Sequence, residues 1–228
     1  MFSEELRRVE LAARPPRILK RASMLRPRVD ERLLKRAGIS LLVGSGQFAF
    51  FFVLAEILYP GYDVSKQTIS DLGATCNQGT CRFVQPSSDI FNASAVLLGL
   101  ALFFASYYLW RGSSSKALPT FELLSGVGSL GVGVFNESFG VVHVFFSAFT
   151  FFSIGIGALL VFKVARPPFS YFAAASGVVT LSSIVFYGTH TYLGLGEGGM
   201  ERMIVYPVLI VGIAFGSYLM ALCGDRLK

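Results

Sequence analysis

The chain alternates long apolar segments with shorter polar ones. Six segments of about twenty residues each are rich in Leu, Val, Phe, Ala and Gly and hold few charges. A helix of that length, rising 1.5 Å per residue, crosses about 30 Å of hydrocarbon. The pattern therefore predicts an all-α, polytopic membrane bundle of six transmembrane helices, at about 38–58, 90–110, 121–139, 141–164, 169–193 and 203–223.

Composition supports this fold class. Of the 228 residues, 53% are hydrophobic and 15% are charged. Soluble domains average about 45–50% apolar and about 25% charged residues. The difference excludes a cytosolic enzyme, a disordered chain and a small disulfide scaffold.

We expect two parts, a basic tail at 1–37 and a six-helix domain at 38–228. The tail holds 11 of the 20 Lys and Arg residues. It lacks the apolar core and cleavage site of a secretory signal. We interpret it first as a cytoplasmic topology determinant. An interfacial amphipathic helix and a partner-binding segment are the alternatives.

The distribution of charge predicts an orientation. With both termini in the cytoplasm, 17 cationic residues lie inside and 3 lie outside. Such a bias follows the positive-inside rule. The net charge of +6 then divides into +10 inside and −4 outside. We predict a multi-pass protein of the cell membrane, N-in and C-in, whose long loop at 59–89 is extracytoplasmic.

Two cysteines lie in this long loop. Cys76 and Cys81 are separated by four residues that include a glycine. Disulfides persist on the outer side of a membrane, so the pair predicts a disulfide that closes the loop. A zinc site is the alternative, without a second cysteine pair to complete it. Cys223 reads as a small buried hydrophobe.

Polar and charged residues gather where the predicted spans meet the outer side. Such residues are costly near hydrocarbon, so each needs a role. We predict a site for a lipid or lipid-linked substrate, either bound or processed, made by Asp71, Asn92, Glu137, His143, His190, Glu201 and Arg202. The alternative is that hydrogen bonds among these residues simply hold the helix ends together.

Each residue of this set receives a provisional role. Glu137, His143 and Asp71 are the candidate catalytic residues, with His143 as a base or metal ligand. The candidates for substrate binding are Asn92, Glu201 and Arg202. The guanidinium of Arg202 would contact a phosphate group. The residue types suit binding as well as catalysis, so we assign no reaction.

The two histidines suggest a cofactor. His143 and His190 fall at one predicted depth, where two histidines and a carboxylate would hold zinc and an activated water. A b-type haem between the same histidines is a lesser alternative.

Helix packing and partners complete the expectations. Four glycines in the third span, Gly126, Gly128, Gly131 and Gly133, predict close contact between helices. Glu122, within the same span, reads as an interface or helix-end residue. Membrane lipids are the expected partners, and the basic tail needs no nucleic acid to explain it. A different class of function is a non-catalytic subunit of a membrane complex, docked through the tail.

Short motifs at the outer edge resemble one family. They are Thr-Ile-Ser-Asp-Leu-Gly at 68–73, Asp-Ile-Phe-Asn at 89–92, Gly-Val-Phe-Asn-Glu at 133–137 and Gly-Gly-Met-Glu-Arg at 198–202. In this order they resemble the prokaryotic membrane proteins catalogued as domain of unknown function 998, over about 38–223. Family members typically carry Phe-Pro-Glu where this chain has Phe-Asn-Glu. A weaker similarity links the chain to the Frag1/DRAM/Sfk1 six-helix proteins, which are associated with lipids. The resemblance implies six helices and a role for the outer-edge residues.

Overall fold

A computed structural model describes residues 30–77, 79–113 and 115–224 of the chain. Within these residues six helices are long and apolar enough to cross a membrane, which confirms the predicted all-α membrane fold. The elements in chain order are α3 (Glu31–Ile57), η1 (Ser70–Leu72), β1 (Thr75–Asn77), β2 (Thr80–Arg82), α4 (Ser87–Gly112), α5 (Ala117–Val134), η2 (Glu137–Phe139), α6 (Val141–Val164), α7 (Phe169–Gly188) and α8 (Gly196–Gly224).

Capping residues decide where several helices begin and end. The carboxylate of Asp30 accepts hydrogen bonds from two backbone N–H groups of the first turn, so α3 begins seven residues before the predicted span. The first 29 residues of the predicted tail lie outside the described residues. The helix α5 ends at Val134, because Asn136 caps η2 and Gly140, with a φ of 53°, turns the chain into α6.

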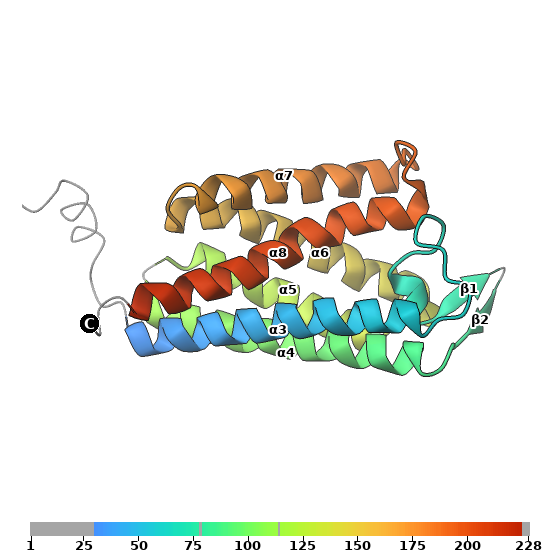
Figure 1. Ribbon diagram of the computed structural model, residues 1–228, viewed down its shortest axis with the longest axis horizontal. Helices are drawn as coiled ribbons and strands as arrows, with labels where there is room; N and C mark the ends of the chain where they lie inside the picture. The colour runs from blue at the N-terminus through green and yellow to red at the C-terminus, as the bar shows by residue number, and fades with distance from the viewer. Residues whose placement is uncertain (1–29, 78, 114, 225–228) are drawn as a thin grey trace, which may run out of the picture.

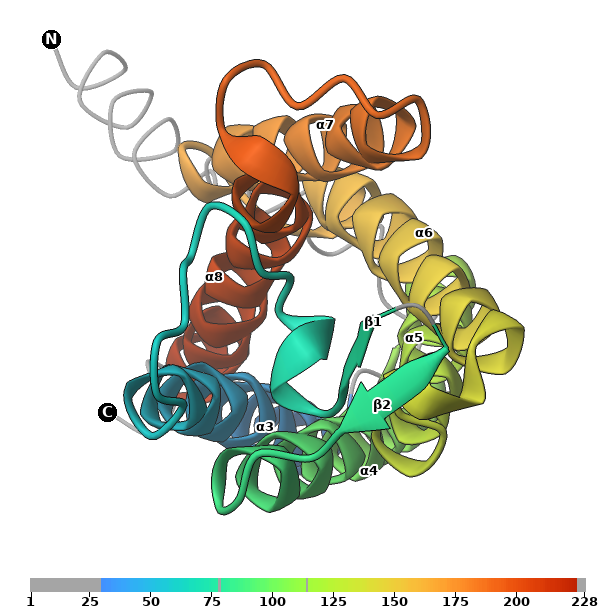
Figure 2. The same cartoon turned by 90° about the vertical axis from the view of Figure 1, so that its right-hand side faces the viewer.

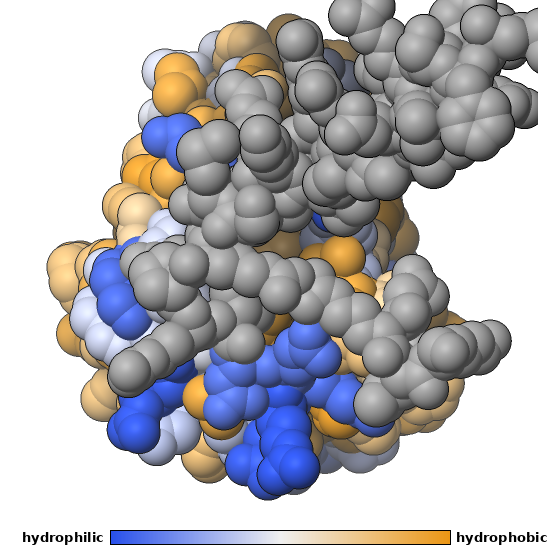
Figure 3. Space-filling view, turned by 90° about the vertical axis from the view of Figure 1, so that its left-hand side faces the viewer, coloured by the Kyte–Doolittle hydropathy of each residue, from blue (hydrophilic) through white to orange (hydrophobic). Residues whose placement is uncertain are grey.

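The six long helices form a ring in chain order. Each packs against its neighbours in sequence, and α8 closes the ring against α3 (Figures 1 and 2). We call the end that carries η1 and the two-stranded β1–β2 hairpin the loop end. The opposite end, where α3 begins and α8 finishes, is the terminal end. Figure 3 shows hydrophilic side chains at the terminal end, where the exposed Arg32, Lys35 and Arg36 lie on the first turns of α3.

Buried apolar side chains fill the ring in two clusters. One lies toward the terminal end and includes Leu41, Val161 and Phe215. The other lies toward the loop end and includes Phe48, Phe91 and Leu72 of η1. The long loop therefore contributes to the core as well as connecting two helices.

Glycines of α5 bring this helix close to both of its neighbours. A Cβ added at Gly126 would lie 2.9 Å from Gly99 O of α4. Gly133 also faces α4, whereas Gly128 and Gly131 face Thr150 and Phe146 of α6. The same four glycines thus serve two interfaces, as small residues do between helices in lipid.

We expect Gly133→Val to destabilise the bundle by about 2 kcal/mol, because overpacking of a tight contact costs about 1–3 kcal/mol. A Cβ at Gly133 would lie 2.6 Å from Asn92 O and 2.8 Å from Val96 N. The control is Gly46→Val, since no heavy atom lies within 4 Å of a Cβ at that position. Thermal unfolding in detergent, followed by circular dichroism, measures both. Equal effects would contradict the close contact.

Candidate functional site

Arg202 of α8 holds the long loop against the bundle. Its side chain is buried, and Nη1 donates to Val64 O at 3.0 Å and to Gln67 O at 3.1 Å. The other terminal nitrogen donates to Tyr62 Oη at 2.7 Å and forms an ion pair with Glu56 of α3. A single guanidinium therefore joins α3, the loop and α8.

Gly198, in the first turn of α8, lets the loop approach this helix closely. Gly198 N donates to Ser65 O at 3.1 Å, and a Cβ at Gly198 would lie 2.6 Å from Val64 O. Any larger residue would push the loop carbonyls away from Arg202. The Gly198-Gly199 pair is the signal in the sequence that marks this contact.

Glu201 holds the next part of the loop. Its buried carboxylate accepts hydrogen bonds from Ile69 N and, at 3.1 Å, from Ser70 Oγ. Consecutive residues of a helix point about 100° apart, so Glu201 and Arg202 grip the loop on different faces of α8. The result is that η1 lies over the centre of the ring, as Figure 2 shows.

Besides Arg202 and Glu201, His143 of α6 is also buried at this end. Its Nδ1 lies 2.7 Å from Phe135 O, and because a carbonyl only accepts, Nδ1 carries the hydrogen. Nε2 then carries no hydrogen and can accept from Ser147 Oγ at 3.2 Å. Ser70 Oγ lies 3.1 Å from Nε2, but its single hydrogen can be donated either to Nε2 or to Glu201, not to both. The two serines were not singled out from the sequence, since serine is ordinary in membrane helices.

Asp71 and Asn92 shape the turn around η1. The Asp71 carboxylate accepts from Thr68 N at 2.7 Å and Thr68 Oγ1 at 3.0 Å, and burial raises the pKa of this carboxyl. Asn92 of α4 donates to Gly73 O at 3.2 Å, while its Oδ1 is buried without a hydrogen bond among the described residues. Both residues position backbone at the mouth of the ring.

Glu137 of η2 interacts electrostatically with other carboxyl groups at the loop end. Burial, together with the nearby Asp71, Glu201 and Glu197, raises the pKa of Glu137 to about 8. Its Oε2 has no hydrogen-bond partner among the described residues. Glu137 is therefore largely protonated at pH 7. The hydrogen-bond contacts of His143 are with Phe135 O and the two serines.

His190 lies apart from this cluster. It is exposed beyond the end of α7, has a φ of 53°, and its Nδ1 lies 2.9 Å from Tyr192 Oη. No group of three or more His, Cys, Asp or Glu side chains that could hold a metal occurs in the described part of the chain. The zinc and haem hypotheses stay predictions.

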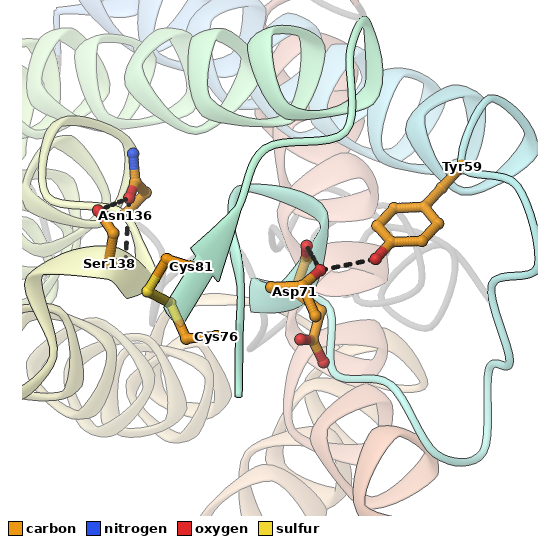
Figure 4. The surroundings of a disulfide bond; sticks show 7 residues. Tyr59, Asp71, Cys76, Cys81, Asn136 and Ser138 are labelled. Atoms are coloured by element: carbon orange, nitrogen blue, oxygen red, sulfur yellow. Dashed lines mark hydrogen bonds between the residues drawn. A yellow bond between two sulfur atoms is a disulfide. The ribbon is translucent and has the colours of Figure 1, made fainter. Parts of the chain in front are cut away.

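The predicted disulfide is confirmed. Cys76 and Cys81 face one another across the β1–β2 hairpin and are joined by an S–S bond of 2.04 Å (Figure 4). Thr75 ties the hairpin to η1, because its Oγ1 donates to Asp71 O at 3.0 Å and lies 2.7 Å from Tyr59 Oη. The hairpin thereby braces the loop from the side opposite α8.

A cavity opens beneath η1 and runs along the ring axis. On α8 its lining extends from Glu201 to Phe215, which is about 21 Å at 1.5 Å per residue. It offers about 90 Å³ to the centres of water-sized spheres. Most of the lining is apolar, and the polar exceptions are Ser45, Ser70, Glu122, Ser129, Ser147, Thr150 and Glu201.

The fold and the cavity define a multi-pass membrane protein with a polar cluster at one end of an apolar cavity. The chain matches the model of a family described as "Protein of unknown function (DUF998)" over residues 42–218, and it belongs to that family. No curated protein and no solved structure matches the chain. The weaker similarity to the Frag1/DRAM/Sfk1 proteins stays a prediction.

We expect Arg202→Gln to destabilise the protein by about 3–5 kcal/mol, the cost of breaking one side of a buried ion pair. Glu56 would be left without its partner and the loop carbonyls without their donor. Thermal unfolding and limited proteolysis within the loop measure the effect. The control is Lys66→Gln, which removes an exposed pair with Asp63 and should leave the stability nearly unchanged, because solvent screens the pair. Equal stability of both variants would contradict the role of Arg202.

The raised pKa of Glu137 predicts a pH dependence. This carboxyl titrates near 4.5 when unfolded and near 8 when folded, so the folded state binds more protons between these values. Stability should therefore fall as the pH rises through this window, by at most about 1.4 kcal/mol per pH unit for one proton. Glu137→Gln should make this slope smaller, because it removes one of the protons that the folded state binds, and the melting temperature in detergent between pH 6 and 8 measures it. Asp89→Asn, which removes an exposed carboxylate, should keep it.

Proposed function

We propose that this protein binds a single-chain lipid, or the chain of a lipid-linked substrate, with the chain in the cavity and the polar group at the loop end. The observation that carries the proposal is the cavity itself. Its apolar walls end on the hydroxyl and carboxylate groups of Ser70, Ser147 and Glu201. An apolar pocket with a few convergent polar groups is the usual form of a ligand site.

The dimensions of the cavity support a chain as its occupant. One leaflet of a bilayer provides about 15 Å of hydrocarbon, half of about 30 Å. The 21 Å lining is therefore long enough for a whole lipid chain. One water needs about 10–15 Å³ by the same measure of volume, so 90 Å³ would hold several waters. The walls favour hydrocarbon, because water needs two to four polar partners.

The polar cluster supports binding more strongly than acyl transfer. Ser70 Oγ lies within reach of His143 Nε2, as a nucleophile and base would. However, the N–H groups of the turn are already used, with Asp71 N donating to Thr68 Oγ1 at 3.1 Å and Gly73 N to Ser70 O at 2.9 Å. An oxyanion would lack a pair of donors and would lie beside Glu201.

In this proposal Arg202 does not contact the ligand. Its four terminal N–H hydrogens are matched by protein acceptors on α3, the loop and α8. A phosphate contact at these terminal nitrogens would have to break the contacts that hold the loop, and Nε, which has no partner among the described residues, is buried. The ligand is therefore met by hydroxyl and carboxyl groups.

The orientation belongs to the proposal as well. We place the loop end outside the cell and both termini in the cytoplasm of a cell membrane. The 17-to-3 distribution of cationic residues supports this orientation. So does the disulfide at the loop end, because disulfides persist in oxidising compartments. The alternative of a non-catalytic subunit rested on the basic tail, most of which lies outside the described residues.

Filling the cavity should remove the bound chain. Ala158 of α6 is buried in the cavity wall, so Ala158→Phe should reduce co-purified single-chain lipid at least about tenfold. Val144→Phe, on the exposed face of the same helix, is the matched control and should keep it. Native mass spectrometry of protein released from lipid nanodiscs measures the bound lipid. Equal loading of the two variants, or a wild-type protein without any bound lipid, would contradict the proposal.

A further inference from the structure

Glu122 of α5 is the second carboxylic acid in the wall of the cavity. It lies toward the terminal end, where its Oε1 would be 3.8 Å from a Cβ at Gly157 of α6. Gly157 is about 15 Å along α6 from Ser147, which borders the polar cluster. Glu122 is therefore separated from the loop-end residues by most of the length of the cavity.

The side chain of Glu122 is buried and lacks a partner. It is 4% exposed, and its Oε2 has no hydrogen bond among the described residues. Nearby hydroxyl groups donate elsewhere, Ser125 Oγ to Phe121 O at 2.8 Å and Ser106 Oγ to Pro119 O at 2.6 Å. The described part of the chain thus supplies no donor that would compensate an ionised carboxylate here.

No positive charge faces Glu122 from the surrounding helices. Among the described residues that line the cavity, none is Lys, Arg or His, and the sole other ionisable group is Glu201 at the loop end. The facing residues of α3, α4, α6 and α8 are apolar or hydroxyl-bearing, such as Leu41, Leu102, Val161 and Phe215. An unpaired carboxylate in such surroundings is costly, whereas a neutral carboxyl is not.

The contents of the cavity therefore decide the state of Glu122. Water molecules in the empty cavity would solvate a carboxylate and allow it to ionise. An alkyl chain would displace that water and leave hydrocarbon against the carboxyl oxygens. We propose that Glu122 is a proton-binding site, and that entry of a chain into the cavity is coupled to the uptake of one proton by Glu122. This inference rests on the proposed function and adds a second ligand, the proton, to the same cavity.

Coupling of this kind is reciprocal. If the chain favours the protonated carboxyl, a low pH favours binding of the chain by the same factor. Affinity then falls as the pH rises, by up to tenfold per pH unit for one proton. The protein would therefore load its chain more readily at low pH than at high pH.

The test is binding of radiolabelled dodecanol to the full chain in lipid nanodiscs, between pH 6 and pH 9. Dodecanol does not titrate in this range, so any pH dependence belongs to the protein. We expect the wild-type affinity to fall with rising pH by up to tenfold per unit. Glu122→Gln, a neutral variant of the same shape, should bind as tightly as the wild type at pH 6 and lose that slope. Ala158→Phe gives the background from partition into the bilayer.

A second variant separates Glu122 from the loop-end carboxyls. Glu137→Gln removes a group that titrates near pH 8 and should keep the slope for dodecanol. A slope retained in Glu122→Gln would overturn the inference while leaving chain binding intact. Failure of dodecanol to bind the wild type above the Ala158→Phe background would overturn the proposed function itself.

Infrared difference spectra report the protonation directly. Addition of dodecanol to the wild type at pH 8 should increase the C=O stretch of a protonated carboxyl. The increase should be absent in Glu122→Gln and present in Glu137→Gln. An increase of the same size in all three proteins would contradict Glu122 as the proton site.

Discussion

The ion pair between Arg202 and Glu56 is the contact on which the loop end depends. It joins the last helix of the ring to the first, and the remaining donors of Arg202 hold the loop carbonyls between them. Removing charges from water is costly, so such a pair is stabilised by acceptors for its remaining donors. The loop provides acceptors for both terminal nitrogens of Arg202, while Nε has no partner among the described residues, so the ring closure and the loop position form one arrangement.

From this arrangement follows the dual nature of the loop. Leu72 and Ile69 bury apolar surface in the core, while Ser70, between them in sequence, presents its hydroxyl to the cavity. A short 3₁₀ helix makes this division possible, because three residues per turn send neighbouring side chains in different directions. The loop thus acts both as part of the hydrophobic core and as the polar end of the cavity.

The sequence predicts well how far along a membrane span a residue lies, but predicts poorly which neighbouring element its side chain faces. Apolar runs and the spacing of Cys76 and Cys81 are local signals, so the six helices and the disulfide could be predicted. The polar residues Asp71, Glu201 and Arg202 could also be singled out, because their cost at the membrane edge does not depend on the fold. Their partners could not, since Arg202 and Val64 are 138 residues apart and meet through the ring. Glu122 read as an interface residue because its position along a span does not reveal which face of the helix it occupies.

The order of the helices around the ring has a consequence for how the protein is made. Neighbours in space are neighbours in sequence, apart from α8, which packs against α3 and also contacts α6. Five helices emerging in turn can each pack on the one before, but the ring stays open until the sixth is inserted. Arg202 and Glu201 belong to that sixth helix, so the loop at 58–86 lacks its contacts with them until this helix is inserted. The cavity is consequently the last part of the bundle to form during biosynthesis, because its wall is incomplete until α8 is in place.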